Sequence, residues 1–450
     1  MNSDLPPTSS TLPRTIWRGL IRARQRSSRA HVRRLFLQYG LPWGMALGVG
    51  WVAVLYAQLS TWAYEQFVHE IAGRPWLAFV ISPLMTMFAL WLTRHWFRGS
   101  EGSGIPQVIA ALHAPHDPNI LGRLFGVRII LGKILISLIG LLGGLTIGRE
   151  GPTVHIGAAM MAETRHFYQR SSLRLERQLL LAGAAAGLSG AFNTPLAGII
   201  FAIEEIARDF QHKTTATMIT AVVFSGLTSL ALAGNYVYFG QIRVPDTFHL
   251  NFIFPVLLAS LICGLLGALF NWVVLHWEHW MPSFLRVWRA QRPLYYALVI
   301  GLIVAFLGVL TGGETWGSGY EQSRHLLEGT APLSEAFALT KWASLVVSYM
   351  AGIPGGLFSP SLSVGAGLAQ WVHAGFAWAP LPALIALCMT GYLAAVTQSP
   401  ITSFVIVMEM TNGSGLVIPM MAAALLSARL SSWFTPPLYE ALARKNYYHP

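Results

Sequence analysis

Charged residues are scarce in this chain. Asp, Glu, Lys and Arg together make up 11% of the 450 residues, whereas about a quarter of an average soluble domain is charged. Apolar residues make up 54%. These values exclude a disordered chain, a coiled coil and an ordinary cytosolic enzyme. The apolar residues form long runs and not short alternating strands, which indicates an all-α polytopic membrane protein.

Cysteine is nearly absent as well. The two cysteines, Cys263 and Cys388, lie inside apolar runs and form no CxxC pattern, which argues against a disulfide framework and favours a packing role. The sequence also lacks zinc-ligand spacing, a phosphate-binding loop and a dinucleotide fingerprint. We therefore expect no metal site, no cofactor and no enzymatic activity.

Acidic residues are almost missing from the N-terminal segment. Residues 1–40 carry eight arginines and one acid, Asp4, which gives +7 of the net charge of +11. A basic arm can bind nucleic acid, but beside the first apolar run the positive-inside rule explains it better. Residues 1–38 are therefore interpreted as a cytoplasmic arm without a nucleic-acid partner. The first apolar run begins near Leu41 and lacks a cleavage-like end, so no signal peptide is expected.

Glycine and proline are abundant, with 43 and 25 copies. Several apolar runs are shorter than the roughly 20 residues that a full membrane span needs. Broken helices within a membrane must have their freed backbone groups satisfied by protein, water or ligand. The sequence predicts half-helices that line an internal site. The least hydrophobic central stretch, 236–251, is the predicted linker between a first half, 39–235, and a second half, 252–450.

The two halves resemble each other. The pattern Gly-x-x-x-Pro-Thr/Ser-x-x-x-Gly-Ala begins at Gly148 and again at Gly356, 208 residues later. A proline followed by eight residues and then a glutamate recurs as 195–204 and 400–409. Repeats with broken helices in corresponding positions are typical of secondary transporters. The sequence leaves open whether the repeats are parallel or inverted.

Three glycine- and proline-rich strings interrupt apolar sequence, at 102–106, 148–152 and 355–360. Each ends in a proline, which is favoured in the first turn of a helix. A helix N-terminus carries about half a positive charge and up to four unpaired N–H groups. Several such ends that converge can bind an anion without a buried cation. The alternative is that these strings are ordinary helix starts in a glycine-rich protein.

Glu150 lies within the second string, between a glycine and a proline. An ionisable residue at membrane depth is functional by default. Its carboxylate would lie where the helix amides point, so it would compete with a transported anion, and its protonation would remove the competitor. The alternative is a salt bridge to Arg149, although adjacent residues rarely face each other on a helix.

Glu204 and Glu205 follow an apolar run. One of them can lie at the surface while the other faces inward as a proton relay, or both can simply close a helix near the cytoplasm. Glu409, the repeat counterpart of Glu204, is interpreted as structural.

Over about residues 40–445, the chain resembles the CLC chloride channel/transporter family. The three strings resemble the family's three anion-pathway signatures, in the same order. Further similar segments are Phe192–Gly198 with Glu204 and Glu205, Met408–Thr411, and Pro437–Tyr439.

The resemblance implies an inverted-repeat helical fold with discontinuous and re-entrant helices, and a homodimer with one anion pathway in each subunit. It assigns the central anion to the hydroxyls of Ser103 and Tyr439 and to the backbone amides of Leu357 and Phe358. Further anion-binding positions are Gly102 and the amides of Arg149 and Gly151.

The resemblance also makes Glu150 the gating glutamate and Glu205 the internal proton-transfer glutamate. Channels of the family usually lack an acid at the position of Glu205, so its presence favours exchange of chloride for protons. Ser103 favours chloride, because nitrate-preferring relatives carry proline there. Gln107 departs from the pattern, since many bacterial antiporters have glutamate at that position.

The expected location is the inner membrane of a bacterium, with chloride and protons as substrates and membrane lipid around the protein. The shortness of the chain leaves no room for the nucleotide-binding regulatory domains of larger relatives, which favours a bacterial origin. Two alternatives stay open: a passive voltage- or pH-gated chloride channel on the same scaffold, and an intramembrane enzyme or cation-coupled solute carrier built from broken helices.

Overall fold

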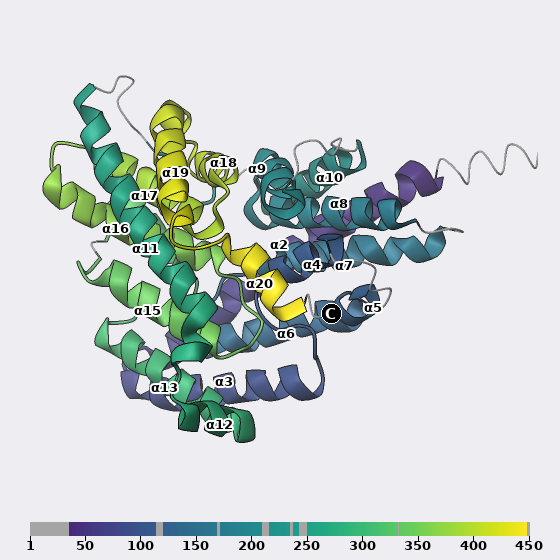
Figure 1. The fold of residues 1–450 in the computed structure, drawn as a ribbon, viewed down its shortest axis with the longest axis horizontal. Coiled ribbons are helices and arrows are strands. Elements are labelled where there is room, and N and C mark those ends of the chain that lie inside the picture. The colour runs from purple at the N-terminus through teal and green to yellow at the C-terminus, as the bar shows by residue number, and fades with distance from the viewer. Residues whose placement is uncertain are drawn as a thin grey trace, which may run out of the picture.

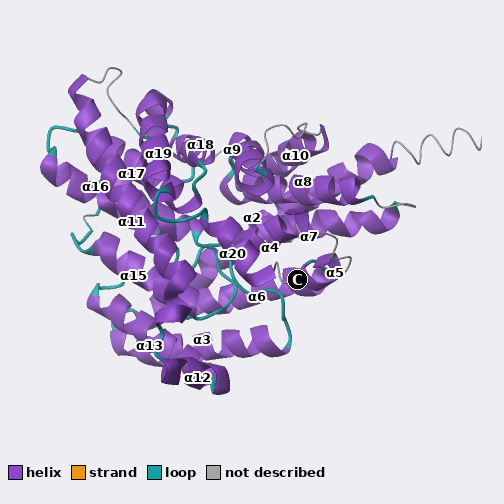
Figure 2. Cartoon of the chain, in the orientation of Figure 1, coloured by secondary structure: helices purple, strands orange, loops and turns teal. Residues whose placement is uncertain are grey.

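The structure is a computed structural model of the chain. It describes residues 36–113, 120–168, 172–208, 216–234, 237–242, 250–331 and 333–447. Within these ranges the ordered elements are helices, and strand-like pairing is limited to two isolated bridges (Figure 2). This agrees with the all-α class predicted from the sequence.

The first half contains helices of very different length. They are α2 (Leu41–Ile71), α3 (Ala78–His95), α4 (Ile105–His113), α5 (Ile120–Leu124), α6 (Val127–Leu142), α7 (Glu150–Glu163), α8 (Leu173–Phe192), α9 (Pro195–Phe201), the π-helical turn η4 (Ala202–Ala207) and α10 (Ala216–Ala233).

The 3₁₀ turn η5 (Leu250–Phe252) lies at the predicted start of the second half, 252–450, directly before α11. Its helices are α11 (Ile253–Trp280), α12 (Ser283–Gln291), α13 (Pro293–Leu310), α14 (Tyr320–Glu328), α15 (Phe337–Met350), α16 (Phe358–Gly375), α17 (Leu381–Thr397), α18 (Pro400–Thr411), α19 (Val417–Ser432) and α20 (Leu438–Tyr447). Helix α20 packs against α4 of the first half (Figure 1).

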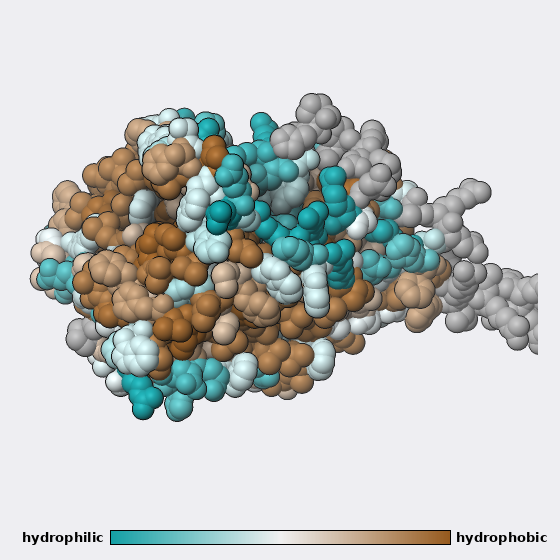
Figure 3. All heavy atoms as spheres, turned by 90° about the horizontal axis from the view of Figure 1, so that it is seen from below, coloured by the Kyte–Doolittle hydropathy of each residue, from teal (hydrophilic) through white to brown (hydrophobic). Residues whose placement is uncertain are grey.

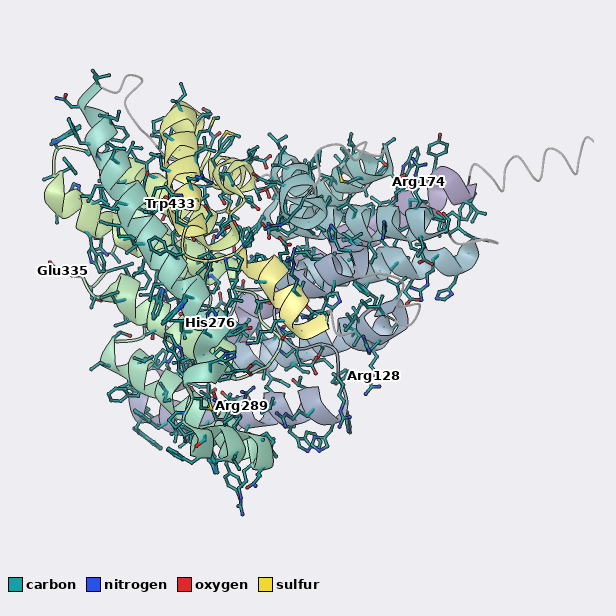
Figure 4. All side chains as sticks on the ribbon, in the orientation of Figure 1. Arg128, Arg174, His276, Arg289, Glu335 and Trp433 are labelled. Atoms are coloured by element: carbon teal, nitrogen blue, oxygen red, sulfur yellow. The ribbon has the colours of Figure 1, made fainter. Side chains whose placement is uncertain are left out.

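Seven helices in the described part of the chain are long and apolar enough to cross a membrane. Only 33–50% of the residues in each of their apolar windows are buried in the protein, so their outer faces are available to lipid. On α11 the exposed side chains recur every three or four residues and form one apolar stripe. Apolar residues cover much of the face in Figure 3, whereas Arg128 and Arg174 lie at the periphery (Figure 4). The stripe on α11 is Phe254, Leu257, Leu261, Leu265 and Leu269.

Both halves interrupt their helices by the same local device. Asn193 directly follows α8 and Gln398 directly follows α17, each in the left-handed conformation, with φ of 56° and 58°. A proline two residues later begins the next, short helix, α9 or α18. Left-handed residues close helices, and proline fits the first turn of the next one. The predicted half-helices are thus confirmed, and they lie at equivalent points of the two halves.

The innermost helices pack closely through glycine. A Cβ atom on Gly187 of α8 would lie 2.5 Å from the carbonyl oxygen of Thr153 on α7. A Cβ atom on Gly365 of α16 would lie 2.6 Å from the carbonyl oxygen of Cys388 on α17. Because no side chain separates the backbones, α7 with α8 and α16 with α17 form a rigid, fully packed centre.

The predicted N-terminal arm and linker are described only in part. Residues 1–35 of the arm lie outside the described residues, and Phe36–Gly40 form a π-helical turn before α2. In the linker, the amide of Phe239 donates to the carbonyl oxygen of Met410 at 2.9 Å, and that of Ile242 to Thr411 at 3.0 Å. These bonds attach the described part of the linker to the end of α18. The domain boundaries remain predictions.

Candidate functional site

The three glycine- and proline-rich strings meet at one place. Gly148 and Gly356 exchange two backbone hydrogen bonds, each 2.7 Å long, in an antiparallel bridge. The amide of Gly102 donates to Ile353 at 3.3 Å, and the amide of Gly355 donates to Gly102 at 3.3 Å. The string of the second half is thus bonded to both strings of the first half. The antiparallel direction at Gly148 and Gly356 fits repeats that run in opposite senses through the membrane.

The strings end in helix N-termini, as predicted. Helix α7 begins at Glu150 and α16 begins at Phe358, and the N-cap residues Arg149 and Leu357 make no side-chain cap. Since first-turn amides have no partner within their own helix, they are available to an anion. Helix α20 begins one residue before Tyr439, so a fourth helix start contributes to the same region.

Glycine is required where these strings touch. A Cβ atom on Gly104 would lie 2.6 Å from the Cβ of His155, and Gly104 has a φ of +104° that other residues rarely adopt. A Cβ atom on Gly151 would overlap the hydroxyl of Ser103. The start of α7 therefore presses directly against the string that carries Ser103.

Ser103 and Tyr439 are both buried, and their hydroxyl groups lie close together. The oxygen of Ser103 forms no well-shaped hydrogen bond with the described protein groups. Buried hydroxyls are nearly always satisfied, so this oxygen has the free donor capacity that an anion would use. Leu357 and Phe358, whose amides were predicted to face the same anion, are buried at the start of α16.

The Glu150 carboxylate is fully buried at the meeting point, and neither oxygen has a well-shaped hydrogen bond within the described residues. It folds back over Gly148, where an added Cβ would lie 2.5 Å from Oε2, and Ser359 lies beside it. Burying a charged group is costly unless donors or a proton compensate it. A buried carboxylate that lies at several helix N-termini and has weak local partners can therefore move out of this position and back, and it can take up a proton.

Arg149 lies nearer to Glu150 than the sequence predicted. Its Nε atom is 4.0 Å from Oε1 of Glu150, so the expectation that the two side chains do not face each other is wrong. The reason is that Arg149 is the N-cap residue and not part of the regular helix. Its guanidinium turns outward, donates to the carbonyl oxygen of Ala57 at 2.8 Å and stacks over the ring of Tyr238.

A cavity of about 380 Å³ adjoins this arginine. Arg149, Thr61, Glu65, Tyr238 and Tyr320 contribute to its walls. Arg149 therefore borders both this cavity and the Glu150 carboxylate. Tyr238 comes from the predicted linker, and no sequence motif marks it.

The adjacent acids Glu204 and Glu205 have separate surroundings. Glu205 is fully buried on the π-helical turn η4, where the hydroxyl of Ser399 donates to Oε2. Glu204 instead accepts hydrogen bonds from the first amides of α18, those of Ile401 and Thr402. The geometry therefore agrees with the interpretation in which one acid, Glu205, faces inward. It differs from the alternative in which both acids simply close a helix.

Tyr439 lies near both buried acids. It is within electrostatic range of both Glu150 and Glu205. Glu409 caps α9 as Glu204 caps α18, with its carboxylate oxygens 3.2 Å from the amide of Leu196 and 2.7 Å from that of Ala197. This geometry agrees with a structural role for Glu409.

Two buried lysines were not singled out from the sequence. Nζ of Lys133 donates to the carbonyl oxygen of Gly102 at 2.7 Å, and Lys341, 208 residues later, donates to three carbonyl oxygens at 2.9–3.1 Å. The acceptors of Lys341 are Thr315, Trp316 and Gly317, which lead into a second Gly-Ser-Gly turn at 317–319. The offset of 208 residues, which also separates Gly148 from Gly356, is the sequence signal that could have identified this pair.

Gln107 has a local role in the structure. Its Nε2 atom donates to the carbonyl oxygen of Glu101 at 2.5 Å, in the loop before the first string. Among the described residues, no three His, Cys, Asp or Glu side chains come close enough together to hold a metal ion.

Sequence comparison gives one family match that covers most of the chain. Residues 85–432 match the model of the voltage-gated chloride channel family. The H⁺/Cl⁻ exchange transporter ClcA of Salmonella newport is 30% identical over 81% of this chain and 78% of its own. That of Klebsiella pneumoniae is 28% identical over 88% of this chain and 86% of its own. Both relatives are named as transporters and not as enzymes.

Solved structures share the fold at lower identity. A slow cyanobacterial Cl⁻/H⁺ antiporter aligns with a TM-score of 0.77 and 20% identity, over 92% of this chain and 98% of that chain. A CLC-type fluoride/proton antiporter aligns with a TM-score of 0.76 and 19% identity, over 89% of this chain and 96% of that one. These alignments confirm the predicted architecture of discontinuous helices.

Proposed function

Because the chain belongs to the voltage-gated chloride channel (CLC) family, we propose that it exchanges chloride for protons across a membrane. The relatives named as H⁺/Cl⁻ exchange transporters support exchange over passive conduction. The observation that carries the proposal is the buried pair of acids, with Glu150 at the converging helix N-termini, Glu205 on the π-helical turn η4, and Tyr439 within electrostatic range of both.

Chloride occupies the space between Ser103 and Tyr439 in this proposal. The two hydroxyls and the amides of Leu357 and Phe358 donate to it, while Gly102 allows the first string to approach. The helix N-termini supply partial positive charge, which attracts the anion without the tight hold of a full buried cation. The anion can therefore be bound and released.

Glu150 alternates with chloride at the amides of Arg149 and Gly151. When its carboxylate is ionised it occupies the electropositive position itself, and when it is protonated it no longer competes there. Each entry of chloride at this position is thus linked to uptake of a proton by Glu150. Glu205 receives or delivers that proton on the opposite side, and Tyr439 is near both acids.

The setting of the protein is part of the proposal. The protein spans the inner membrane of a bacterium with its N-terminus in the cytoplasm, in accord with the arginines of residues 1–38. It forms a homodimer surrounded by lipid and uses no cofactor. The exposed apolar side chains of α9, α10 and α18 support a contact with a second subunit or with lipid, since exposed apolar surfaces mark interfaces or lipid contacts. Examples are Leu196, Leu227, Leu230 and Ile401.

Reconstitution into liposomes tests the proposal. A chloride gradient imposed across the vesicles should drive protons in the opposite direction, against their own gradient, at a fixed ratio to chloride. Chloride that runs down without proton movement would reject exchange and establish the passive channel. Absence of chloride flux with an intact, folded protein would reject anion transport altogether.

Variants of the two acids locate the coupling. Glu205→Gln should stop proton flux while chloride still moves, and Glu150→Ala should leave chloride flux that no longer depends on pH. Glu409→Gln, which changes a cap and not the proposed proton path, is the matched control and should remain coupled. A Glu150→Ala protein that retains coupling would show that another residue is the gate.

A further inference from the structure

The buried proton-transfer candidate Glu205 shares an arginine with a second carboxylate. Nη2 of Arg208 lies 3.5 Å from Oε1 of Glu205, and Nη1 of the same guanidinium lies 3.1 Å from Oε2 of Glu440. Nη2 also donates to the carbonyl oxygen of Thr397 at 3.4 Å, at the end of α17. The guanidinium is therefore divided between a fully buried acid and a partly exposed one.

The backbone holds Arg208 in this place. Glu205 lies on the π-helical turn η4, and Arg208 directly follows this turn in the left-handed conformation, with φ of 49° and ψ of 28°. π-Helical turns are rare and frequent at functional sites, and the left-handed conformation is unfavourable for a residue with a side chain. Arg208 lies three residues after Glu205, a spacing that lets the two side chains meet, and its left-handed conformation ends the helix at this point.

The contacts lead stepwise from the interior to the surface. The side chain of Glu205 is 0% exposed, that of Arg208 is 23% exposed and that of Glu440 is 25% exposed. Glu440 also pairs with Arg444, whose side chain is 69% exposed. Glu440 directly follows Tyr439 on α20, so the same short helix carries an anion-site hydroxyl and a partner of the arginine.

We propose that Arg208 is a positioning residue that sets how readily Glu205 takes up a proton, and that Glu440 tunes it by drawing the guanidinium away from Glu205. The inference rests on the proposed proton exchange. A positive charge beside a carboxylate favours its ionised form. Full pairing with Arg208 therefore opposes proton uptake by Glu205, and sharing with Glu440 relieves that opposition.

Other titratable groups face this turn from neighbouring elements. Glu204 precedes Glu205 and is held by the first amides of α18, and Tyr439 faces Glu205 from α20. His113 on α4 has Nε2 3.2 Å from the carbonyl oxygen of Ala207, in the same turn. Each of these groups stays unchanged in the variants below, so its contribution is the same throughout the comparison.

The test measures chloride-driven proton flux and chloride flux as functions of pH, with the full-length protein in liposomes. Glu440→Gln leaves Arg208 to Glu205 alone and should move the half-maximal proton flux to lower pH by about one unit. Arg208→Gln removes the positive charge and should move it by a similar amount to higher pH. Arg208→Lys keeps the charge and should return the profile toward that of the wild type. Chloride flux should stay within about twofold in all three.

The matched control is Glu278→Gln. Glu278 forms a different ion pair with α20, in which its Oε2 atom lies 3.2 Å from Nζ of Lys445, and it has no part in the contacts of Glu205. Glu278→Gln should leave the pH profile in place. If it shifts the profile as much as Glu440→Gln does, the ion pairs act only by anchoring α20, and the inference is overturned.

Other outcomes distinguish failure of this inference from failure of the proposed function. Unshifted profiles in a wild-type protein that exchanges protons, or shifts in the same direction for Glu440→Gln and Arg208→Gln, would overturn this inference and leave the proposed function intact. A wild-type protein without proton flux would overturn the proposed function and this inference with it. If Arg208→Gln fails to fold, Glu440→Gln and Arg208→Lys decide: a shift to lower pH in Glu440→Gln beside a wild-type-like profile in Arg208→Lys supports the inference, and an unshifted Glu440→Gln overturns it.

Discussion

The two halves of the molecule share their scaffold and differ in their acids. Gly148 and Gly356 bond to each other at the centre. Lys133 and Lys341 each bind the carbonyl oxygens of a glycine-rich turn from a fully buried position. Glu204, which follows α9, caps the N-terminus of α18, and Glu409, which lies on α18, caps the N-terminus of α9. These positions hold the broken helices together, and both halves keep them.

The titratable positions follow the opposite rule. At the offset of 208 residues, Glu150 corresponds to Phe358, and at the offset of 205, Glu205 corresponds to Met410. All four side chains are buried. Backbone amides at helix N-termini can be supplied by both halves without harm, because a peptide dipole does not titrate. The acids proposed to load and release protons occupy one half only, so the proposed mechanism has a single gate and a single proton path.

The two halves should differ most in proton coupling when Glu150 and its counterpart Phe358 are each replaced and the two variants are compared. Glu150→Gln should abolish proton flux, because glutamine can neither bind the proton nor compete as an anion. Phe358→Leu keeps the backbone amide at the start of α16 and should retain coupling with a changed rate. Parallel measurements of chloride and proton flux in liposomes check this pair. Loss of coupling in Phe358→Leu alone would contradict the assignment of the gate to the first half.

The buried lysines should show the strongest effect on stability, and an equal one in both halves. Lys133→Met and Lys341→Met each leave buried carbonyl oxygens unpaired, which should cost about 3 kcal/mol in each variant. Thermal unfolding in detergent measures the loss. Lys445→Met, at a partly exposed lysine on α20, is the control and should change stability by less than about 0.5 kcal/mol. A loss confined to one lysine would break the symmetry of the scaffold.

The two Gly-Ser-Gly turns should differ in anion binding. Ser103→Ala removes a hydroxyl donor from the proposed chloride site and should weaken chloride binding by about tenfold, or about 1.4 kcal/mol. Ser318→Ala changes the corresponding turn, which lines a separate pocket beside Arg149 and Tyr320, and should alter affinity by less than about twofold. Calorimetric titration of purified protein with chloride compares them. Equal weakening by both would remove Ser103 from the anion site.

The crossed caps should give the smallest effect. Glu204→Gln and Glu409→Gln each exchange a charged cap at a helix N-terminus for a neutral one, which should cost about 1 kcal/mol. Glu335→Gln, at an exposed acid on the periphery (Figure 4), is the neutral control. Unfolding in detergent serves as the readout. A cap variant as stable as this control would show that its carboxylate is not needed there.

Much of the scaffold was predictable because glycine and proline act locally. Pro195 and Pro400 begin short helices in the structure as they do in the sequence pattern. The strings that contain Gly102 and Gly148 were predicted to converge, and their backbones are bonded through the third string. Conformational limits of this kind depend on a residue and its neighbours, so a single sequence carries them.

The contacts of long side chains were not predictable. The guanidinium of Arg149 reaches Ala57, 92 residues away, and that of Arg208 reaches Glu440, 232 residues away. Only the packed fold brings these partners together. The same limit hid the lysine at 133, which sits in an apolar run and binds a turn 31 residues earlier.

The central claim is that helix N-termini from both halves form one halide site, in which the Glu150 carboxylate is the alternative occupant. An anomalous-scattering map of crystals grown with bromide tests it most directly. The account predicts bromide between the hydroxyls of Ser103 and Tyr439 in the wild type, and additional bromide at the place of the carboxylate in Glu150→Gln. Bromide absent from both places, or an unchanged pattern in the variant, would contradict the account.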